Sequence, residues 1–125
     1  MIDLRTIVYQ KLSPLCEQVY YQEAPQACVL PYAVFSFPSS NRVYKEQRQY
    51  ELEVTIYYAE KNGYNVASSI DALTEQIISV LDYKTGDSSD LSAWFKFEQR
   101  LEVPFPDGSH LWGRQLRFTA YTYEE

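Results

Sequence analysis

Residues 50–58 read YELEVTIYY, a stretch in which apolar and polar side chains alternate. A period of two places Leu52, Val54 and Ile56 on one face of an extended chain, and the two glutamates between them on the other. This is the clearest strand pattern in the chain. It predicts a β-strand with one buried face, and that face requires a covering layer.

Two segments with a helical pattern can form the layer that covers this face. Apolar residues spaced three and four apart predict a helix over residues 3–15, with Asp3 as its N-cap and Ser13-Pro14 as its end. The same spacing predicts a second helix over residues 65–82. The apolar face of the first helix is Leu4, Ile7, Val8, Leu12 and Leu15, and that of the second is Val66, Ile70, Leu73, Ile77 and Leu81.

Three further segments have the composition of strands, at residues 32–37, 93–103 and 116–120. Residues 19–21 read as a short extended piece, and the strand from residue 32 is expected to stop at Pro38. Turns or loops are expected at residues 39–42, 84–90 and 104–109. The order is therefore helix, strand, strand, helix, strand, strand. We expect one α+β domain over residues 1–125, with an antiparallel sheet of about four strands and both helices on one face.

The other face of this sheet is predicted to carry polar and aromatic side chains. The chain has 12 Tyr residues, and tyrosine suits surfaces that become buried on docking because it joins an apolar ring to a polar tip. A tyrosine-rich sheet core is the competing interpretation. The candidate interface with another subunit or a partner is Tyr57, Arg117, Tyr121 and Tyr123.

Charge and hydropathy exclude several classes of partner. The formal net charge is -6, from 11 basic and 17 acidic side chains, which argues against binding to nucleic acid or to an anionic membrane. No apolar run reaches the roughly 20 residues that cross a bilayer, and the first residues do not resemble a signal peptide. Cys16 and Cys28 are expected to be reduced thiols.

No group of residues predicts catalysis, a metal site or a cofactor site. His110 is the sole histidine. The Tyr57-x-x-x-Lys61 spacing lacks the glycine-rich turn of a dinucleotide site, and Glu51 and Glu53 fit the solvated face of a strand. Residues 87–90 lack the ligand series of a calcium loop. We therefore expect a protein that is not an enzyme.

Several segments resemble one group of phage proteins. Residues 4–9 (LRTIVY) followed by Leu12 are similar to the first helix of phage tail-terminator and tail-completion proteins. The residues Val19-Tyr20, then Pro25 and PYAVF at 31–35, resemble their entry into the first strand. Residues 111–124 (LWGRQLRFTAYTYE) resemble the closing strand of the minor tail protein U family of lambdoid phages.

This resemblance implies a virion protein of a phage or prophage, assembled in the bacterial cytoplasm. Its partners would be itself, in a ring commonly of six subunits, the tail tube protein and the head connector protein. Such a ring caps the head-proximal end of the tail tube, ends tube growth and forms the head-tail joint. Two alternatives stay open: another connector or minor capsid component, and a small-molecule binding domain with Tyr and Trp residues around its pocket.

Overall fold

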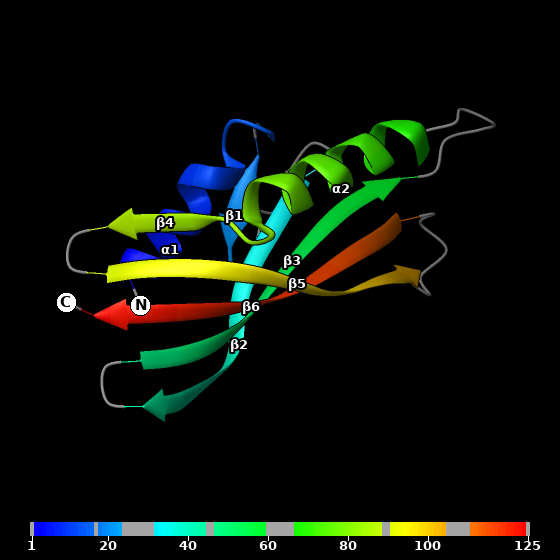
Figure 1. Cartoon of the computed structure of the whole chain (residues 1–125). Helices are drawn as coiled ribbons and strands as arrows, with labels where there is room; N and C mark the ends of the chain where they lie inside the picture. Colours follow the sequence, from blue (N-terminus) through cyan, green and yellow to red (C-terminus); the bar gives the residue numbers. More distant parts are fainter. Residues whose placement is uncertain are drawn as a thin grey trace.

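A computed structural model describes residues 2–16, 18–23, 32–44, 47–59, 67–88, 91–104 and 111–124, which form two helices and six strands (Figure 1). The elements in chain order are α1 (Ile2–Leu12), β1 (Val19–Tyr21), β2 (Tyr32–Tyr44), β3 (Gln47–Ala59), α2 (Ala67–Leu81), β4 (Thr85–Ser88), β5 (Leu91–Pro104) and β6 (Leu111–Glu124). The α+β class expected from the sequence is confirmed.

The strands make one sheet in the order β1-β2-β3-β6-β5-β4. Its centre is the antiparallel pair of β3 and β6, in register from Gln47 opposite Tyr123 to Ala59 opposite Leu111. β1 pairs with β2 in parallel, so the sheet is mixed. The prediction of about four antiparallel strands, and of their order, is wrong in these details. The two extra strands contain only three and four residues, too few to show an alternating pattern.

The strand expected to stop at Pro38 instead continues to Tyr44. Its register with β3 shifts between Ser36 and Ser39, so Pro38 lies in a β-bulge. β1 pairs with Ala33 to Phe35 only, and among the described residues no strand pairs with the far side of β2 at Pro38. Proline is tolerated at edges and bulges because no ladder partner needs its missing N–H. A second bulge lies in β5, between Phe97 and Gln99.

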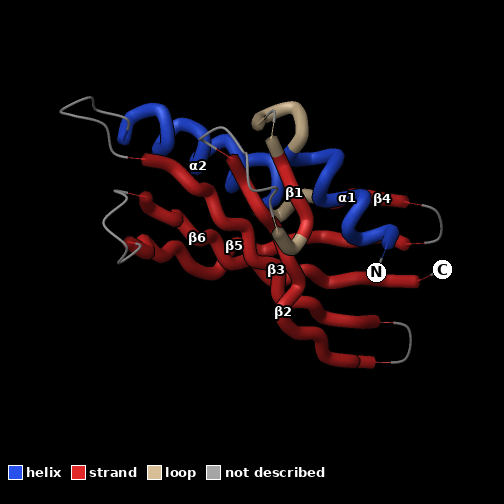
Figure 2. Tube along the Cα trace, turned by 180° about the vertical axis from the view of Figure 1, so that it is seen from behind, coloured by secondary structure: helices blue, strands red, loops and turns tan. Residues whose placement is uncertain are grey.

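Both helices lie on one face of the sheet, as predicted (Figure 2). Between the two layers is a single apolar core to which α1, α2 and five of the strands contribute. Its largest fully buried side chains include Phe35, Phe95 and Phe118. α1 ends at Leu12, directly before the expected stop signal Ser13-Pro14, so the helix is shorter than the predicted 3–15, and Asp3 lies in its first turn instead of capping it. Leu15 packs against the core from the following turn.

The segment predicted as a polar loop after α2 is the edge of the sheet. The backbone N–H of Tyr83 donates to the carbonyl of Phe95 at 2.7 Å, and the N–H of Phe97 donates to the Asp82 carboxylate at 2.8 Å. Strand β4 then pairs with the start of β5 and packs against α1. The approach is close: a β-carbon built on Gly86 would lie 2.5 Å from Cγ2 of Ile7.

Candidate functional site: the outer face of the sheet

We call the face of the sheet turned away from α1 and α2 the outer face. It is lined by odd-numbered residues of β3 and β6, because the even-numbered residues 50–58 of β3 and 114–122 of β6 are buried in the core or packed against the helix side. All four residues of the candidate interface lie here. Arg117 is opposite Glu53, Tyr121 is opposite Gln49, Tyr123 is opposite Gln47, and Tyr57 is opposite Gly113.

The four residues are spread along the sheet. Tyr57 lies eight positions along β3 from the partner of Tyr121, a separation of roughly 26 Å at about 3.3 Å per residue. Tyr57 stacks on Tyr32, with ring centroids 5.0 Å apart. Tyr121 stacks on Trp94 at 4.3 Å with an angle of 15° between the rings. Two separate aromatic stacks therefore mark the two ends of the outer face.

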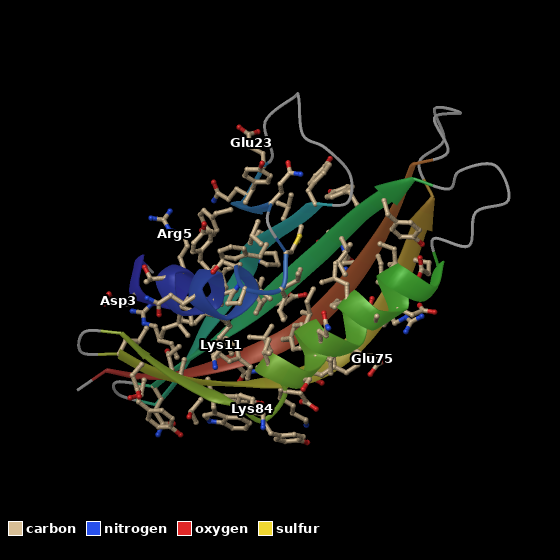
Figure 3. The ribbon with its side chains drawn as sticks, turned by 90° about the horizontal axis from the view of Figure 1, so that it is seen from above. Asp3, Arg5, Lys11, Glu23, Glu75 and Lys84 are labelled. Atoms are coloured by element: carbon tan, nitrogen blue, oxygen red, sulfur yellow. The ribbon has the colours of Figure 1, made fainter. Side chains whose placement is uncertain are left out.

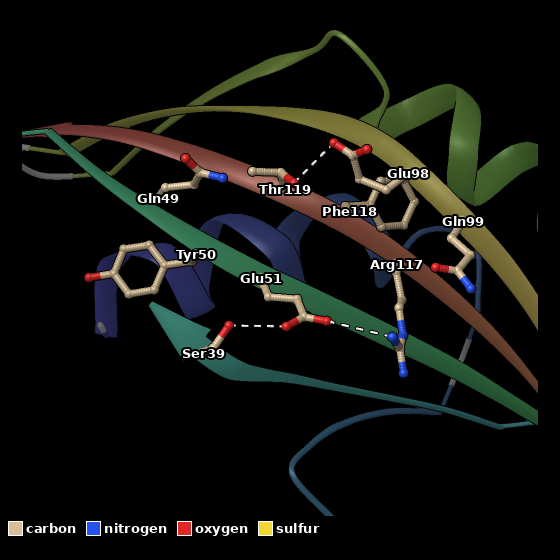
Figure 4. Close-up of a pocket in the computed structure, with 9 residues that line it drawn as sticks. All are labelled: Ser39, Gln49, Tyr50, Glu51, Glu98, Gln99, Arg117, Phe118 and Thr119. Atoms are coloured by element: carbon tan, nitrogen blue, oxygen red, sulfur yellow. Dashed lines mark hydrogen bonds and ion pairs between the residues drawn. The ribbon is translucent and has the colours of Figure 1, made fainter. Parts of the chain in front are cut away.

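A shallow hollow of about 290 Å³ lies between these ends (Figure 4). The bulges in β2 and β5 flank it, because Ser39 follows the first bulge and Glu98 lies within the second. Bulges increase local twist and redirect side chains, so they account for both the hollow and the position of Glu98. The lining residues are Ser39, Gln49, Tyr50, Glu51, Glu98, Gln99, Arg117, Phe118 and Thr119.

Hydrogen bonds hold the carboxylates of the hollow. The Ser39 hydroxyl donates to Glu51 at 3.0 Å, and the Thr119 hydroxyl donates to Glu98 at 3.0 Å. An Arg117 guanidinium nitrogen lies 4.0 Å from Glu51, and both side chains are 38% exposed. These are fixed acceptors open to solvent, an arrangement that suits recognition of donor groups on another surface.

A polar ladder continues along β6 towards Tyr57. The Nε of Arg117 donates to the Gln115 side chain at 3.2 Å, and the Gln115 amide donates to Glu53. Burial, and then repulsion by Glu53, raise the pKa of Tyr57 above its ordinary value of 10.0. The pKa shift means that Tyr57 loses its phenolic proton only at a higher pH than a tyrosine in water does.

A second hollow, of about 360 Å³, opens between α1 and β1. Tyr20, Tyr21 and Phe35 line it from the sheet, and Tyr9, 50% exposed, lines it from the helix. The guanidinium of Arg5 lies 4.7 Å from the ring centre of Tyr21. Its aromatic lining is what the small-molecule alternative expects.

The remaining residues that the sequence analysis considered make local contacts, are exposed, or lie outside the described residues. Cys16 donates its thiol to the carbonyl of Gln18 at 3.4 Å. Lys84 and Glu75 are exposed on the helix side of the molecule, where the half-buried Arg5 and Lys11 also lie (Figure 3). Cys28, Lys61, Val66, residues 105–109 and His110 lie outside the described residues.

The described part of the chain was searched for metal-ligand groups and for membrane-spanning helices. Within it, no three His, Cys, Asp or Glu side chains are grouped as metal ligands. None of its helices has the length and apolar character that a membrane span requires.

Sequence reasoning missed three residues that shape the outer face. Trp94 was not identified as the stacking partner of Tyr121. Ser39 and Glu98 were not identified because their orientation depends on the two bulges. A signal was available for one of them: the alternation of β5 breaks after Phe97, where Glu98-Gln99-Arg100 are consecutive polar residues.

Comparison with known proteins shows similarity in fold alone. No protein-family model matches the sequence, and a search of the curated proteins finds no match. Thirty chains of solved structures match the fold. One is from the "Virion of native gene transfer agent (GTA) particle", with a TM-score of 0.70 and 12% sequence identity. The match covers 97% of this chain and 95% of that chain.

Proposed function

We propose that this protein is a structural component of a phage-like virion. The observation that carries the proposal is the fold similarity to a chain of a gene transfer agent virion, which extends over nearly the whole of both chains. The phage-like motifs at residues 4–12, 19–35 and 111–124 support it from a separate source, the sequence. On this proposal the protein is not an enzyme and acts by assembling with other virion proteins.

The specific role we propose is that of a tail terminator. Subunits join in a ring, commonly of six, on the head-proximal end of the tail tube, where they stop tube growth and receive the head connector protein. A cyclic ring uses heterologous contacts, in which one surface of each subunit meets a different surface of the next. Each subunit therefore needs two different docking surfaces, one for each of its neighbours in the ring.

The outer face has the properties of such a docking face. The ring of Tyr121 is already stacked on Trp94, so little side-chain entropy remains to be lost when a partner covers the pair. Tyr123, 42% exposed, extends this aromatic area at the same end of the sheet. Arg117 and the carboxylates of the hollow supply charged groups that give a contact specificity.

A direct test uses gold-labelled protein and isolated tail tubes, observed by electron microscopy. A terminator binds to one end of each tube, and we expect Tyr121→Ala to reduce this end binding about tenfold while the protein stays folded. Tyr9→Ala is the matched control, because it removes an exposed tyrosine from α1 on the opposite side of the molecule. Folded protein that leaves both tube ends unlabelled refutes the tail-terminator role.

Another connector position is the second candidate within the virion, and binding to isolated connectors instead of tubes identifies it. A small-molecule binding domain is the candidate from a different class, and the hollow between α1 and β1 favours it. That function predicts a monomer whose melting temperature rises with a ligand. In that case Tyr9→Ala abolishes the rise in melting temperature that the ligand causes, whereas Tyr121→Ala leaves this rise intact.

A further inference from the structure

The turn between α2 and β4 holds an aromatic residue in an unusual backbone conformation. Tyr83 lies two residues beyond the end of α2 and has a φ angle of 57°. Its N–H donates to the carbonyl of Phe95 at 2.7 Å, and the N–H of Lys84 donates to the carbonyl of Leu81 at 3.0 Å, so the turn is fixed. A bulky side chain is disfavoured at a positive φ angle, and glycine is the residue that usually ends a helix in this way.

The packing of the chain does not account for a tyrosine at this position. The side chain of Tyr83 is 68% exposed, the largest fraction for any large apolar side chain among the described residues. It is also absent from the described residues that form the core or pack against it. Strain of this kind persists mainly at functional positions, and a tyrosine that the fold does not need is suited to docking.

The next residue is a cation without a counter-ion. Lys84 is exposed on the helix side of the molecule (Figure 3). Among the residues that the structure describes, no carboxylate lies within ion-pair distance of its ammonium group. One turn thus offers an aromatic ring and an unbalanced positive charge in consecutive residues, which we call the Tyr83-Lys84 turn.

The hollow of the outer face has a complementary charge. Glu98 accepts a hydrogen bond from Thr119, but no cation in the described part of the chain lies within ion-pair distance of it, Lys96 on the same strand included. The charge of Glu51 is already partly balanced by Arg117 at 4.0 Å. A carboxylate can accept several hydrogen bonds, so Glu98 can receive an ammonium group and keep its bond from Thr119.

An aromatic surface lies beside this carboxylate. The stack of Tyr121 on Trp94 begins two residues along β6 from Thr119, which is roughly 7 Å at about 3.3 Å per residue. Two consecutive residues of another molecule can therefore place a ring on the stack and an ammonium group at Glu98. Aromatic contact then supplies affinity, and the opposite charges fix the register of the contact.

We infer that the Tyr83-Lys84 turn of one subunit docks in the outer-face hollow of a second copy of the chain, where Lys84 pairs with Glu98 of that copy. This rests on the ring of the proposed function and supplies its second docking surface. The turn precedes β4 at the edge of the sheet, whereas the hollow opens on the outer face. Contacts between two such different surfaces repeat from subunit to subunit until a ring closes.

Charge exchange in the full-length protein tests the contact, with self-association measured by sedimentation over a range of concentrations. Lys84→Glu and Glu98→Lys are each expected to weaken self-association about tenfold. The double variant recovers most of the loss, because the pair is restored with its charges reversed. Glu75→Lys is the matched control, since Glu75 is also exposed on the helix side. Combined with Lys84→Glu, it restores the net charge without the contact, so self-association stays weak.

A second pair of variants separates docking from folding. Tyr83→Gly is expected to weaken self-association about tenfold with little change in melting temperature, because glycine adopts a positive φ angle without strain. Gln22→Gly is its control. Gln22 is exposed and has a φ angle of 69°, so this substitution relieves similar strain and leaves self-association unchanged.

Several results would overturn the inference. One is a chain that stays monomeric at every concentration, and another is assembly that stops at a dimer, because the contact is then not heterologous. A double variant that associates no better than Lys84→Glu alone also overturns it, as does Tyr83→Gly with a lowered melting temperature and unchanged self-association. The labelling of tail-tube ends is a separate measurement. End labelling without recovery by charge exchange removes only this contact, and recovery without end labelling removes only the terminator role.

Discussion

Replacing Gly86 by alanine tests how tightly α1 packs on β4. The added methyl group would lie 2.5 Å from Cγ2 of Ile7, whereas carbon atoms in contact lie about 3.5–4.0 Å apart. The helix and the strand must then separate by about 1 Å. The methyl group of Ile7 cannot move aside, because the residue is fully buried and β-branched side chains in helices hold one rotamer.

Overpacking of this kind destabilises a core by about 1–3 kcal/mol. Alanine recovers roughly 0.5–1 kcal/mol, because it loses less backbone entropy than glycine on folding. We therefore expect Gly86→Ala to lower the free energy of unfolding by about 1 kcal/mol, and by about 2.5 kcal/mol at most. For a chain of 125 residues this lowers the melting temperature by roughly 3–8 °C, measurable by circular dichroism.

A double-mutant cycle with Ile7→Ala locates the effect. Removing the obstructing methyl group makes Gly86→Ala neutral or stabilising in that background. Asp87→Ala serves as the control for changes to β4 that leave the helix contact intact. An unchanged melting temperature in Gly86→Ala would refute the close packing of α1 on this edge of the sheet.

Three further predictions concern the core and its pH dependence. Phe95→Ala removes a fully buried ring and should lower the free energy of unfolding by about 3–5 kcal/mol in urea titrations. Leu73→Asp should destabilise the domain less than Ile77→Asp, because Leu73 is only partly buried; equal losses would contradict this. Burial, together with Glu53 and Glu102 respectively, raises the pKa of Tyr57 and Tyr58 above 10.0. The stability that these two hydroxyl groups contribute is therefore fully present below pH 10 and is lost as the pH rises above it, and Tyr58→Phe should make that fall shallower.

The long elements were predictable from sequence because their burial pattern is regular. In β3 the alternating residues Leu52, Val54 and Ile56 are all buried in the structure, as the alternation requires. The same holds for α1, where Leu4, Ile7, Val8 and Leu12 are all buried. Such segments bury one face against a single layer and leave the other outside it, so their sequence periodicity directly reflects their surroundings.

Features that depend on contacts between distant segments were not predictable in this way. β1 and β4 are strands because β2 and β5 offer them an edge, and nothing in their own three or four residues requires it. The ion pairs of Arg114 left a trace in the sequence, since Arg114 falls on the apolar side of the last strand's alternation. Its partners Asp71 and Glu102, 43 and 12 residues away, could be identified only in the folded chain.

The outer face has features that were predictable from the sequence and features that were not. Alternation placed Tyr57, Arg117, Tyr121 and Tyr123 on one side of the sheet, and they lie there. Their grouping was not encoded in any local pattern. The distance between Tyr57 and Tyr121 follows from the register of β3 with β6, and the hollow between them follows from two bulges in the neighbouring strands.

The pairing of β3 with β6 also has a consequence during synthesis of the protein. Two hairpins, β2–β3 and β5–β6, meet only through this pair, whose residues are separated by more than fifty positions along the chain. A nascent chain on the ribosome cannot complete the sheet before β6 emerges, and until then β3 has an open edge and an apolar face. Pairing over such a separation is slow, and exposed edges favour aggregation. Cells translating this chain should therefore benefit from a chaperone that holds the β2–β3 hairpin until the last strand arrives.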